Sequence, residues 1–295
     1  MQYKTFANYI KQQEDKLKSQ HPEISASLLA QIAPKEYIPS KADITNKGVL
    51  LIHGLLDSST SMNSLYDSFS KKNYHVKNIL LPGHGTTPND LLHVTYQDWL
   101  ECVEFSLNSF PNNINDITII GLSAGAILGC YLAQNYKKVS RLILFAPAFE
   151  LKAKGSSLIS PLHKFNELVP PLAVEWLVSQ TETSATKYKS VTTNCAHQLS
   201  LLIKLVKNKP LHCPIFTVIS TDDETVSSAG TIKLLLKQKH HQNKLIIYSN
   251  GKVKQPLPKS TKCITSCIPS EQILNFSHVS MHIAPEHPIY GQKKS

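Results

Sequence analysis

The chain has 295 residues, of which 41% are hydrophobic and 18% are charged, values that are typical of a globular protein. It contains no apolar run of about 18 residues, and its polar N-terminus lacks the apolar segment of a secretory signal, so we expect a cytoplasmic protein with reduced cysteines. The net charge of +10 comes from dispersed lysines. This dispersion argues against nucleic acid as a partner, and it leaves solubility, an acidic substrate or peripheral contact with an anionic lipid surface as explanations.

The first half of the chain alternates between two kinds of pattern. Residues 1–46 are expected to form a polar, helical lead-in with a short amphipathic helix near 25–32. Continuous apolar runs then predict buried strands, and amphipathic spacing predicts the helices between them. The strands are expected at 48–52, 75–81, 116–120 and 141–145, and the helices at 61–72, 96–110 and 126–136. Such alternation predicts a mostly parallel sheet with helices on both faces.

The second half interrupts this alternation before resuming it. Residues 149–210 hold apolar clusters without a strand-like run, and helical spacing resumes near 198–206, so we expect a helical cap over the sheet edge. Strands follow at 214–220 and 244–248 around a helix at 227–237. Residues 250–272 are rich in lysine, proline and serine and are predicted to be a loop insertion. We expect one domain over 1–295, with a core of about 47–148 and 211–295 and a cap of about 149–210.

The motif Gly121-Leu122-Ser123-Ala124-Gly125 lies between a predicted strand and a predicted helix. A serine at the tip of such a sharp turn has its hydroxyl exposed, and the flanking glycines avoid a collision across the turn. This setting is typical of a nucleophile elbow. The alternative is an ordinary turn of small residues between a strand and a helix.

A serine nucleophile needs a base in hydrogen-bond reach and a carboxylate that orients the base. Past the strand 214–220 the chain offers Asp222 or Asp223, and a later polar loop offers His278. The order Ser, Asp, His is the one that converges in an α/β-hydrolase sheet. The backbone N–H groups of Leu55 and Ala124 are candidates for an oxyanion hole.

Five motifs in this order resemble the α/β-hydrolase superfamily, with carboxylesterases, monoacylglycerol lipases and lysophospholipase-like serine hydrolases as the nearest groups. The motifs are Leu51-Ile52-His53-Gly54, Pro82-Gly83-His84-Gly85, Gly121-Leu122-Ser123-Ala124-Gly125, Asp223-Glu224-Thr225-Val226 and Ser277-His278. The resemblance implies the α/β-hydrolase fold with a helical cap insertion. It also implies Ser123 as nucleophile, His278 as general base and acid, and Asp223 as the orienting acid, since the family acid usually reads Asp-x-x-Val. The connection between residues 248 and 278 is longer than is usual in the family.

Other histidines and cysteines allow competing interpretations. The spacing of Cys263, Cys267, His278 and His282 resembles a zinc site, and a metal on His278 would prevent its action as a base. The two cysteines could instead form a small disulfide or lie unpaired, and His282 is an alternative base. His53 and His84 are expected to shape loops near the site rather than to transfer protons.

Together these patterns predict a serine hydrolase that cleaves carboxylic esters without a metal or organic cofactor. The apolar cap favours small-molecule esters with medium or long acyl chains, of the monoacylglycerol or lysophospholipid type. A thioesterase, peptidase or acyltransferase could use the same triad, and a non-catalytic ligand-binding member of the fold is the alternative from another class. The oligomeric state is not predicted.

Overall fold

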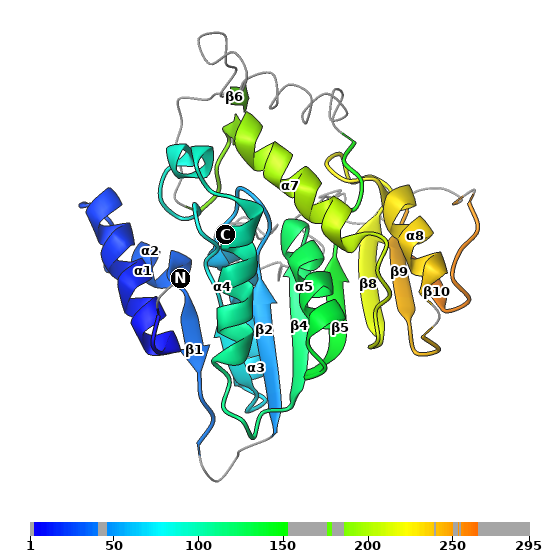
Figure 1. Cartoon of the computed structure of the whole chain (residues 1–295), viewed down its shortest axis with the longest axis horizontal. Coiled ribbons are helices and arrows are strands. Elements are labelled where there is room, and N and C mark those ends of the chain that lie inside the picture. The colour runs from blue at the N-terminus through cyan, green and yellow to red at the C-terminus, as the bar shows by residue number, and fades with distance from the viewer. Residues whose placement is uncertain are drawn as a thin grey trace, which may run out of the picture.

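An eight-stranded, mostly parallel sheet forms the centre of the molecule (Figure 1). The computed structural model describes residues 3–40, 46–152, 176–178, 186–238, 240–249, 253 and 255–264. The strand order is β1-β3-β2-β4-β5-β8-β9-β10, and only β1 runs antiparallel to its neighbour. The strands are β1 (Lys35–Tyr37), β2 (Lys47–Ile52), β3 (His75–Asn78), β4 (Asp116–Leu122), β5 (Val139–Phe145), β8 (Ile215–Ser220), β9 (Lys244–Tyr248) and β10 (Thr261–Ile264).

Helices cover both faces of the sheet, as right-handed crossovers between parallel strands require. The helices are α1 (Phe6–Gln20), α2 (Ala26–Ile32), α3 (Asn63–Ser70), α4 (Tyr96–Asn108), α5 (Ala124–Asn135), α7 (Thr193–Val206) and α8 (Ser228–Lys237), with short 3₁₀ turns η2 (Ser59–Met62) and η3 (Pro88–Leu92). From β2 the chain moves to β3 on one side, and from β4 it moves to β5 on the other. The carboxyl ends of β2 and β4 therefore flank the point where ligands bind in open α/β sheets. The architecture is the mostly parallel sheet with helices on both faces that the sequence predicted.

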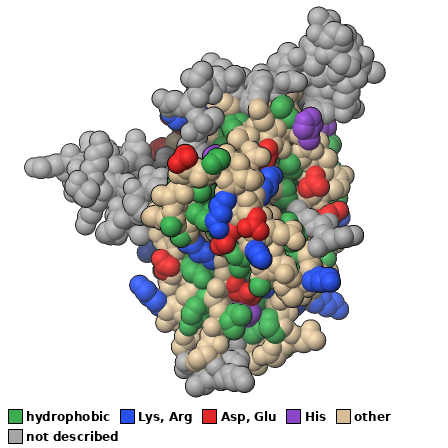
Figure 2. Space-filling view, turned by 90° about the vertical axis from the view of Figure 1, so that its left-hand side faces the viewer, with side chains coloured by type: hydrophobic (Ala, Val, Ile, Leu, Met, Phe, Trp, Pro, Cys, Tyr) green, Lys and Arg blue, Asp and Glu red, His purple; other side chains and the backbone are tan. Residues whose placement is uncertain are grey.

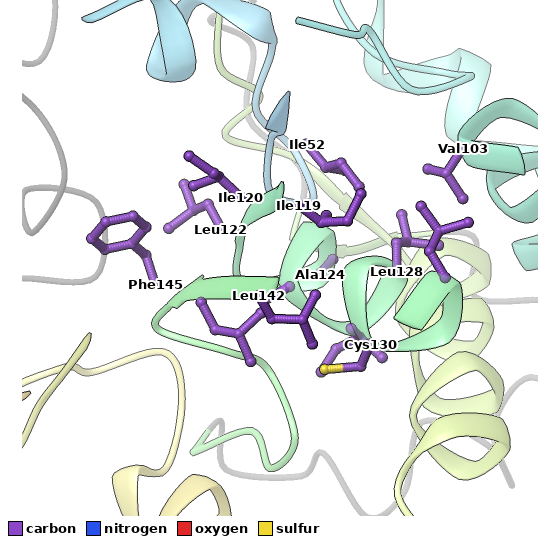
Figure 3. Packing of buried hydrophobic residues seen from close by; sticks show 14 of the residues in the cluster. Ile52, Val103, Ile119, Ile120, Leu122, Ala124, Leu128, Cys130, Leu142 and Phe145 are labelled. Carbon is purple, nitrogen blue, oxygen red and sulfur yellow. The ribbon is translucent and has the colours of Figure 1, made fainter. Parts of the chain in front are cut away.

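The core lies where α4 and α5 pack on the central strands. Successive residues of β4 point to opposite faces of the sheet, so Ile119 faces α5 while Ile120 and Leu122 lie on the other side (Figure 3). Because these side chains and Leu142 of β5 are almost completely buried, β4 and β5 have apolar groups on both faces. Burial on both faces explains the continuous apolar runs that predicted these strands.

The structure corrects the prediction of a loop insertion over residues 250–272. Residues Thr261–Ile264 form β10, which pairs in parallel with β9 at the sheet edge. Cys263 and Lys262 are exposed on this strand. An edge strand with so little burial has no apolar run or strict alternation, which is why its sequence did not indicate a strand.

Three further short strands were not expected. Within the helical lead-in, β1 adds an antiparallel edge to β3. Within the segment expected to be a helical cap, β6 (Trp176–Val178) pairs antiparallel with β7 (Val191–Thr192), which corrects the expectation of no strand there. Helix α7 begins at Thr193, five residues before the predicted 198, and packs against α4 and α5. The division into core and cap stays a prediction.

A buried lysine of the sheet forms an ion pair with a glutamate of the N-terminal lead-in. Lys77 of β3 is fully buried, and its Nζ lies 3.4 Å from Oε1 of Glu36, which also lies 2.8 Å from Nε2 of His75. Burial lowers the pKa of Lys77 to about 8, although Glu36 opposes this lowering. The ammonium group also contacts the hydroxyl of Ser109 and the rings of Phe6 and Phe110. Glu36 is therefore the counter-charge of a desolvated cation.

We expect Glu36→Gln to lower the free energy of unfolding by about 3 kcal/mol, because it leaves Lys77 buried without an opposite charge. Urea denaturation measures this loss. Asp116→Asn is the matched control, since Asp116 pairs with an Arg141 side chain that is 45% exposed, and the expected loss there is under about 1 kcal/mol. Equal losses in the two variants would contradict this interpretation of Lys77.

On the face formed by the lead-in side, Lys and Arg side chains alternate with Asp and Glu side chains rather than gathering in one basic patch (Figure 2). Among the described residues, no helix combines the length and apolar character that crossing a membrane requires.

Candidate active site

Ser123 lies at the turn between β4 and α5 in a backbone conformation that is rare for a non-glycine residue. Its φ is 53° and its ψ is −113°. A Cβ added to Gly121 would lie 2.4 Å from the carbonyl oxygen of Gly125, and a Cβ added to Gly125 would lie 2.3 Å from that of Ile52. Both glycines are therefore required by close backbone contacts, and these contacts maintain a strained serine of the kind that accompanies functional sites.

The first turn of α5 starts directly at this serine. The N–H of Ser123 donates to the carbonyl of Phe145 at the end of β5, so it is already used. The next N–H belongs to Ala124, the first residue of α5. N–H groups at a helix N-terminus favour negative charge, which suits the role predicted for Ala124. The Ser123 side chain makes no capping bond to this helix.

The loop after β2 lies against the serine. A Cβ added to Gly54 would lie 3.3 Å from the Cβ of Ser123, so the backbone of the His53-Gly54 turn lies beside the candidate nucleophile with little room between them. Leu55 follows this contact, and Leu56 has a φ of 63°, in the left-handed region. We call residues 54–56 the oxyanion loop. The structure thus brings the segments of Leu55, Ser123 and Ala124 together.

Both nitrogens of His53 and of His84 bond to backbone groups. Nε2 of His53 accepts from the N–H of Leu81, and Nε2 of His84 accepts from the N–H of Leu56 at 3.2 Å. Each Nε2 is therefore unprotonated, and each Nδ1 donates to a carbonyl, that of Gly54 or Pro82. These are the contacts of histidines that shape loops.

The candidate acids lie in the loop after β8, residues 221–226, which we call the acid loop. Asp223 is 1% exposed, and its Oδ1 accepts hydrogen bonds from the N–H groups of Thr225 at 2.8 Å and Val226 at 3.0 Å. These bonds hold the carboxyl group in one orientation. Asp222 is half-buried and accepts from the hydroxyl of Thr221 at 3.3 Å. The fixed carboxyl group of Asp223 favours it over Asp222 as the orienting acid.

Two residues that the sequence did not single out contact these loops. Lys152 donates from Nζ to the carbonyl of Asp223 at 2.6 Å, and its N–H donates to the carbonyl of Thr225. Tyr188 donates its N–H to the carbonyl of Leu56 at 2.7 Å. Neither belongs to a motif, and each is a single polar residue in an irregular stretch, so no sequence signal pointed to it.

The predicted base, His278, and its alternative His282 lie outside the described residues. Of the proposed zinc ligands, Cys263 is exposed on β10, and Cys267, His278 and His282 lie outside the described residues. Within the described part of the chain, no three His, Cys, Asp or Glu side chains form a group that could hold a metal ion. The triad and the zinc alternative both stay predictions.

Burial of His53 and His84 predicts that the folded protein loses stability at acidic pH. Burial lowers the pKa of His84 from 6.5 to about 4, and burial together with His84 lowers the pKa of His53 well below 6.5. Between these values and 6.5 the unfolded chain binds more protons, so stability falls as the pH drops below 6.5. For His84 alone the loss approaches roughly 3 kcal/mol near pH 4.

Melting temperatures from pH 8 to pH 4.5 check this expectation. His84→Gln should give a shallower decline below pH 6.5, because the variant has no imidazole to protonate on unfolding. His212→Gln is the control, because His212 is exposed and its replacement should leave the slope unchanged. A wild-type melting temperature that stays constant across this range would contradict the prediction.

Comparison with known proteins identifies the family to which the chain belongs. Residues 44–252, well over half of the chain, match the family model described as serine aminopeptidase, S33. A thermostable monoacylglycerol lipase from Bacillus sp. (strain H-257) is 28% identical over 184 residues, which cover 61% of this chain and 71% of that protein.

Solved structures show the same fold at low identity. A monoacylglycerol lipase from Paleococcus ferrophilus is similar with a TM-score of 0.59 and 13% identity, covering 74% of this chain and 88% of that one. A soluble variant of monoglyceride lipase from Saccharomyces cerevisiae, in complex with a substrate analog, is similar with a TM-score of 0.58 and 16% identity, covering 74% and 81%.

Proposed function

Because the chain belongs to the α/β-hydrolase family described as serine aminopeptidase, S33, we propose that it is a serine hydrolase that cleaves carboxylic esters. The single observation that carries this proposal is the strained conformation of Ser123, with φ of 53° and ψ of −113° between two glycines that have no room for a side chain. Backbone strain of this kind persists where the surrounding structure maintains it for a function.

The proposed reaction begins with attack of Ser123 Oγ on the ester carbonyl carbon. His278 takes the hydroxyl proton, and Asp223 orients and stabilises the resulting imidazolium. The carbonyl π electrons move to the oxygen, and the N–H groups of Leu55 and Ala124 stabilise that negative charge. When the C–O bond to the alcohol breaks, His278 returns the proton to the leaving oxygen. Water then repeats the sequence and releases the acid from the acyl-enzyme.

The proposed substrates are small esters with medium or long acyl chains, of the monoacylglycerol or lysophospholipid type. The similar Bacillus protein is named a monoacylglycerol lipase, and this similarity supports a glyceride ester. The apolar residues between 149 and 210 also favour an acyl chain, because ligand pockets are mostly apolar. The cytoplasmic location and contact with an anionic lipid surface stay predictions.

Labelling with a fluorophosphonate probe tests the nucleophile, and a series of p-nitrophenyl esters tests the substrate. We expect stoichiometric labelling at Ser123, mapped by peptide mass spectrometry, and faster turnover of octanoyl and longer esters than of acetyl. A protein that folds but takes up no probe would overturn the hydrolase proposal. A preference for acetyl would overturn only the proposed acyl-chain class.

A peptidase is the second candidate, because the matching family is described as a serine aminopeptidase. The same triad attacks amides, so the two activities differ in the leaving group and not in the nucleophile. Amino-acid p-nitroanilides assayed beside p-nitrophenyl esters separate them. Turnover of the anilides that is lost in Ser123→Ala would favour the peptidase, whereas turnover of the activated esters is expected from either class of enzyme.

A further inference from the structure

In the oxyanion loop, both backbone groups of Leu56, its N–H and its carbonyl, make hydrogen bonds to other segments. The N–H of Leu56 donates to Nε2 of His84 at 3.2 Å, and the carbonyl of Leu56 accepts from the N–H of Tyr188 at 2.7 Å. Leu56 has a positive φ of 63°, which costs free energy for a leucine. These two bonds therefore stabilise a conformation that the residue would not adopt by itself.

Tyr188 also binds the loop that carries His84. Its hydroxyl accepts from the N–H of Thr86 at 2.9 Å and donates to the carbonyl of Gly83 at 3.1 Å. Its ring lies parallel to the His84 imidazole, with the planes within 3° and the centroids 6.2 Å apart. The side chain of Tyr188 thus fixes the backbone on both sides of His84, and the backbone N–H of the same residue fixes Leu56.

The phenol stays a donor at any working pH. Tyr188 is 3% exposed, and burial raises the pKa of its hydroxyl. The group therefore keeps its proton, and the bond to the Gly83 carbonyl is maintained. Because the imidazole of His84 donates from Nδ1 to Pro82, its Nε2 lone pair points at Leu56.

We propose that Tyr188 is a positioning residue for ester hydrolysis, which holds the oxyanion loop so that the N–H of Leu55 points at the reacting carbonyl oxygen. This inference rests on the proposed function, since it assumes that Leu55 donates to the oxyanion. The backbone N–H of Tyr188 binds the Leu56 carbonyl directly, and the phenol acts on the Leu56 N–H through the loop that carries His84, which is the contribution that Tyr188→Phe removes. Donors that are fixed before the reaction stabilise the developing charge without a cost of reorganisation.

The test compares Tyr188→Phe with Tyr9→Phe. Tyr9 is an equally buried tyrosine whose hydroxyl also bridges a backbone N–H and a carbonyl, both of Leu80, at 2.8 and 2.7 Å. Both variants lose one phenol that makes two backbone bonds, so a purely structural effect lowers the melting temperature of both. The rate per active site, counted by fluorophosphonate titration, separates positioning from stability.

We expect Tyr188→Phe to lower kcat per titrated site by about 10- to 100-fold with KM changed less than about twofold, whereas Tyr9→Phe keeps the wild-type kcat. Affinity for a trifluoromethyl ketone, whose adduct with the serine carries an oxyanion, should fall by the same factor as kcat/KM. His84→Gln is the second variant if Tyr188→Phe does not fold, and it should lower kcat in the same way.

A folded Tyr188→Phe with wild-type kcat and wild-type ketone affinity overturns the positioning role, as does a folded His84→Gln with both unchanged when Tyr188→Phe does not fold. Loss of the same factor in Tyr9→Phe also overturns it, because the effect would then be general. Labelling of Ser123 in the wild type is read separately. If the wild type takes up no probe, the proposed function fails, whatever the tyrosine variants do.

Discussion

Ser123→Ala is expected to lower kcat for p-nitrophenyl ester hydrolysis by roughly 10⁴- to 10⁶-fold, because it removes the atom that attacks the carbonyl. The proposed mechanism places the attacking oxygen at the N-terminus of α5, beside the turn of Gly54. The substrate pocket is unchanged by the loss of one oxygen. KM should therefore change far less than kcat.

Steady-state kinetics with active-site titration measure this effect. Ser68→Ala is the matched control, since Ser68 is exposed on α3 and bonds only within its own helix. That variant should keep wild-type rates. The fluorophosphonate probe should label Ser68→Ala and wild type equally and should not label Ser123→Ala. Substantial turnover by a purified Ser123→Ala protein would remove this serine from the mechanism.

Gly125→Ala should have the second large effect, on folding rather than on chemistry. The added methyl group would lie 2.3 Å from the carbonyl oxygen of Ile52 and 2.4 Å from that of His53. Both atoms are backbone at the end of a central strand, so they cannot rotate away. We expect the free energy of unfolding to fall by about 3 kcal/mol or more, with much of the protein insoluble.

Gly129→Ala in the same helix is the control for Gly125→Ala. There the nearest atom is the Ile119 Cγ2 methyl at 3.0 Å, a side-chain group that can shift. Alanine also gains about 1 kcal/mol of helix propensity over glycine. We expect a melting temperature near that of the wild type. If Gly125→Ala melts within about 2 °C of the wild type, the close contact of α5 with the end of β2 is not a requirement of the fold.

The strands that the sequence predicted best are those whose two faces are both buried in the apolar core. β2 and β4 are buried on both faces, so their sequences are continuous apolar runs that few other structures produce. Ser123 could be identified from the sequence because its turn requires glycine at positions 121 and 125, and these two residues form a recognisable motif with the serine. By contrast, β1 and β10 lie at the sheet edges, where half-buried or exposed residues form no apolar run.

Contacts between distant loops could not be predicted in the same way. Tyr188 and Lys152 act through hydrogen bonds to backbone groups of segments 71 to 132 residues away, and such bonds accept almost any sequence at the partner backbone. The residues alone left Asp222 and Asp223 as candidates for the orienting acid, and the family pattern Asp-x-x-Val selected Asp223. The N–H donors of Thr225 and Val226 support that choice. His278 stays a prediction from the order of motifs.

The segment between β5 and β8 is attached at two points to loops at the carboxyl edge of the sheet. On departure, Leu151 bridges Val226 in the acid loop, and on return Tyr188 binds Leu56 in the oxyanion loop. Beyond the second attachment point, β7 pairs with β6, so the return of the chain is also tied to residues 176–178. A segment grafted from a related enzyme would therefore have to keep Leu151, Tyr188 and the β6–β7 pair to leave both loops in place.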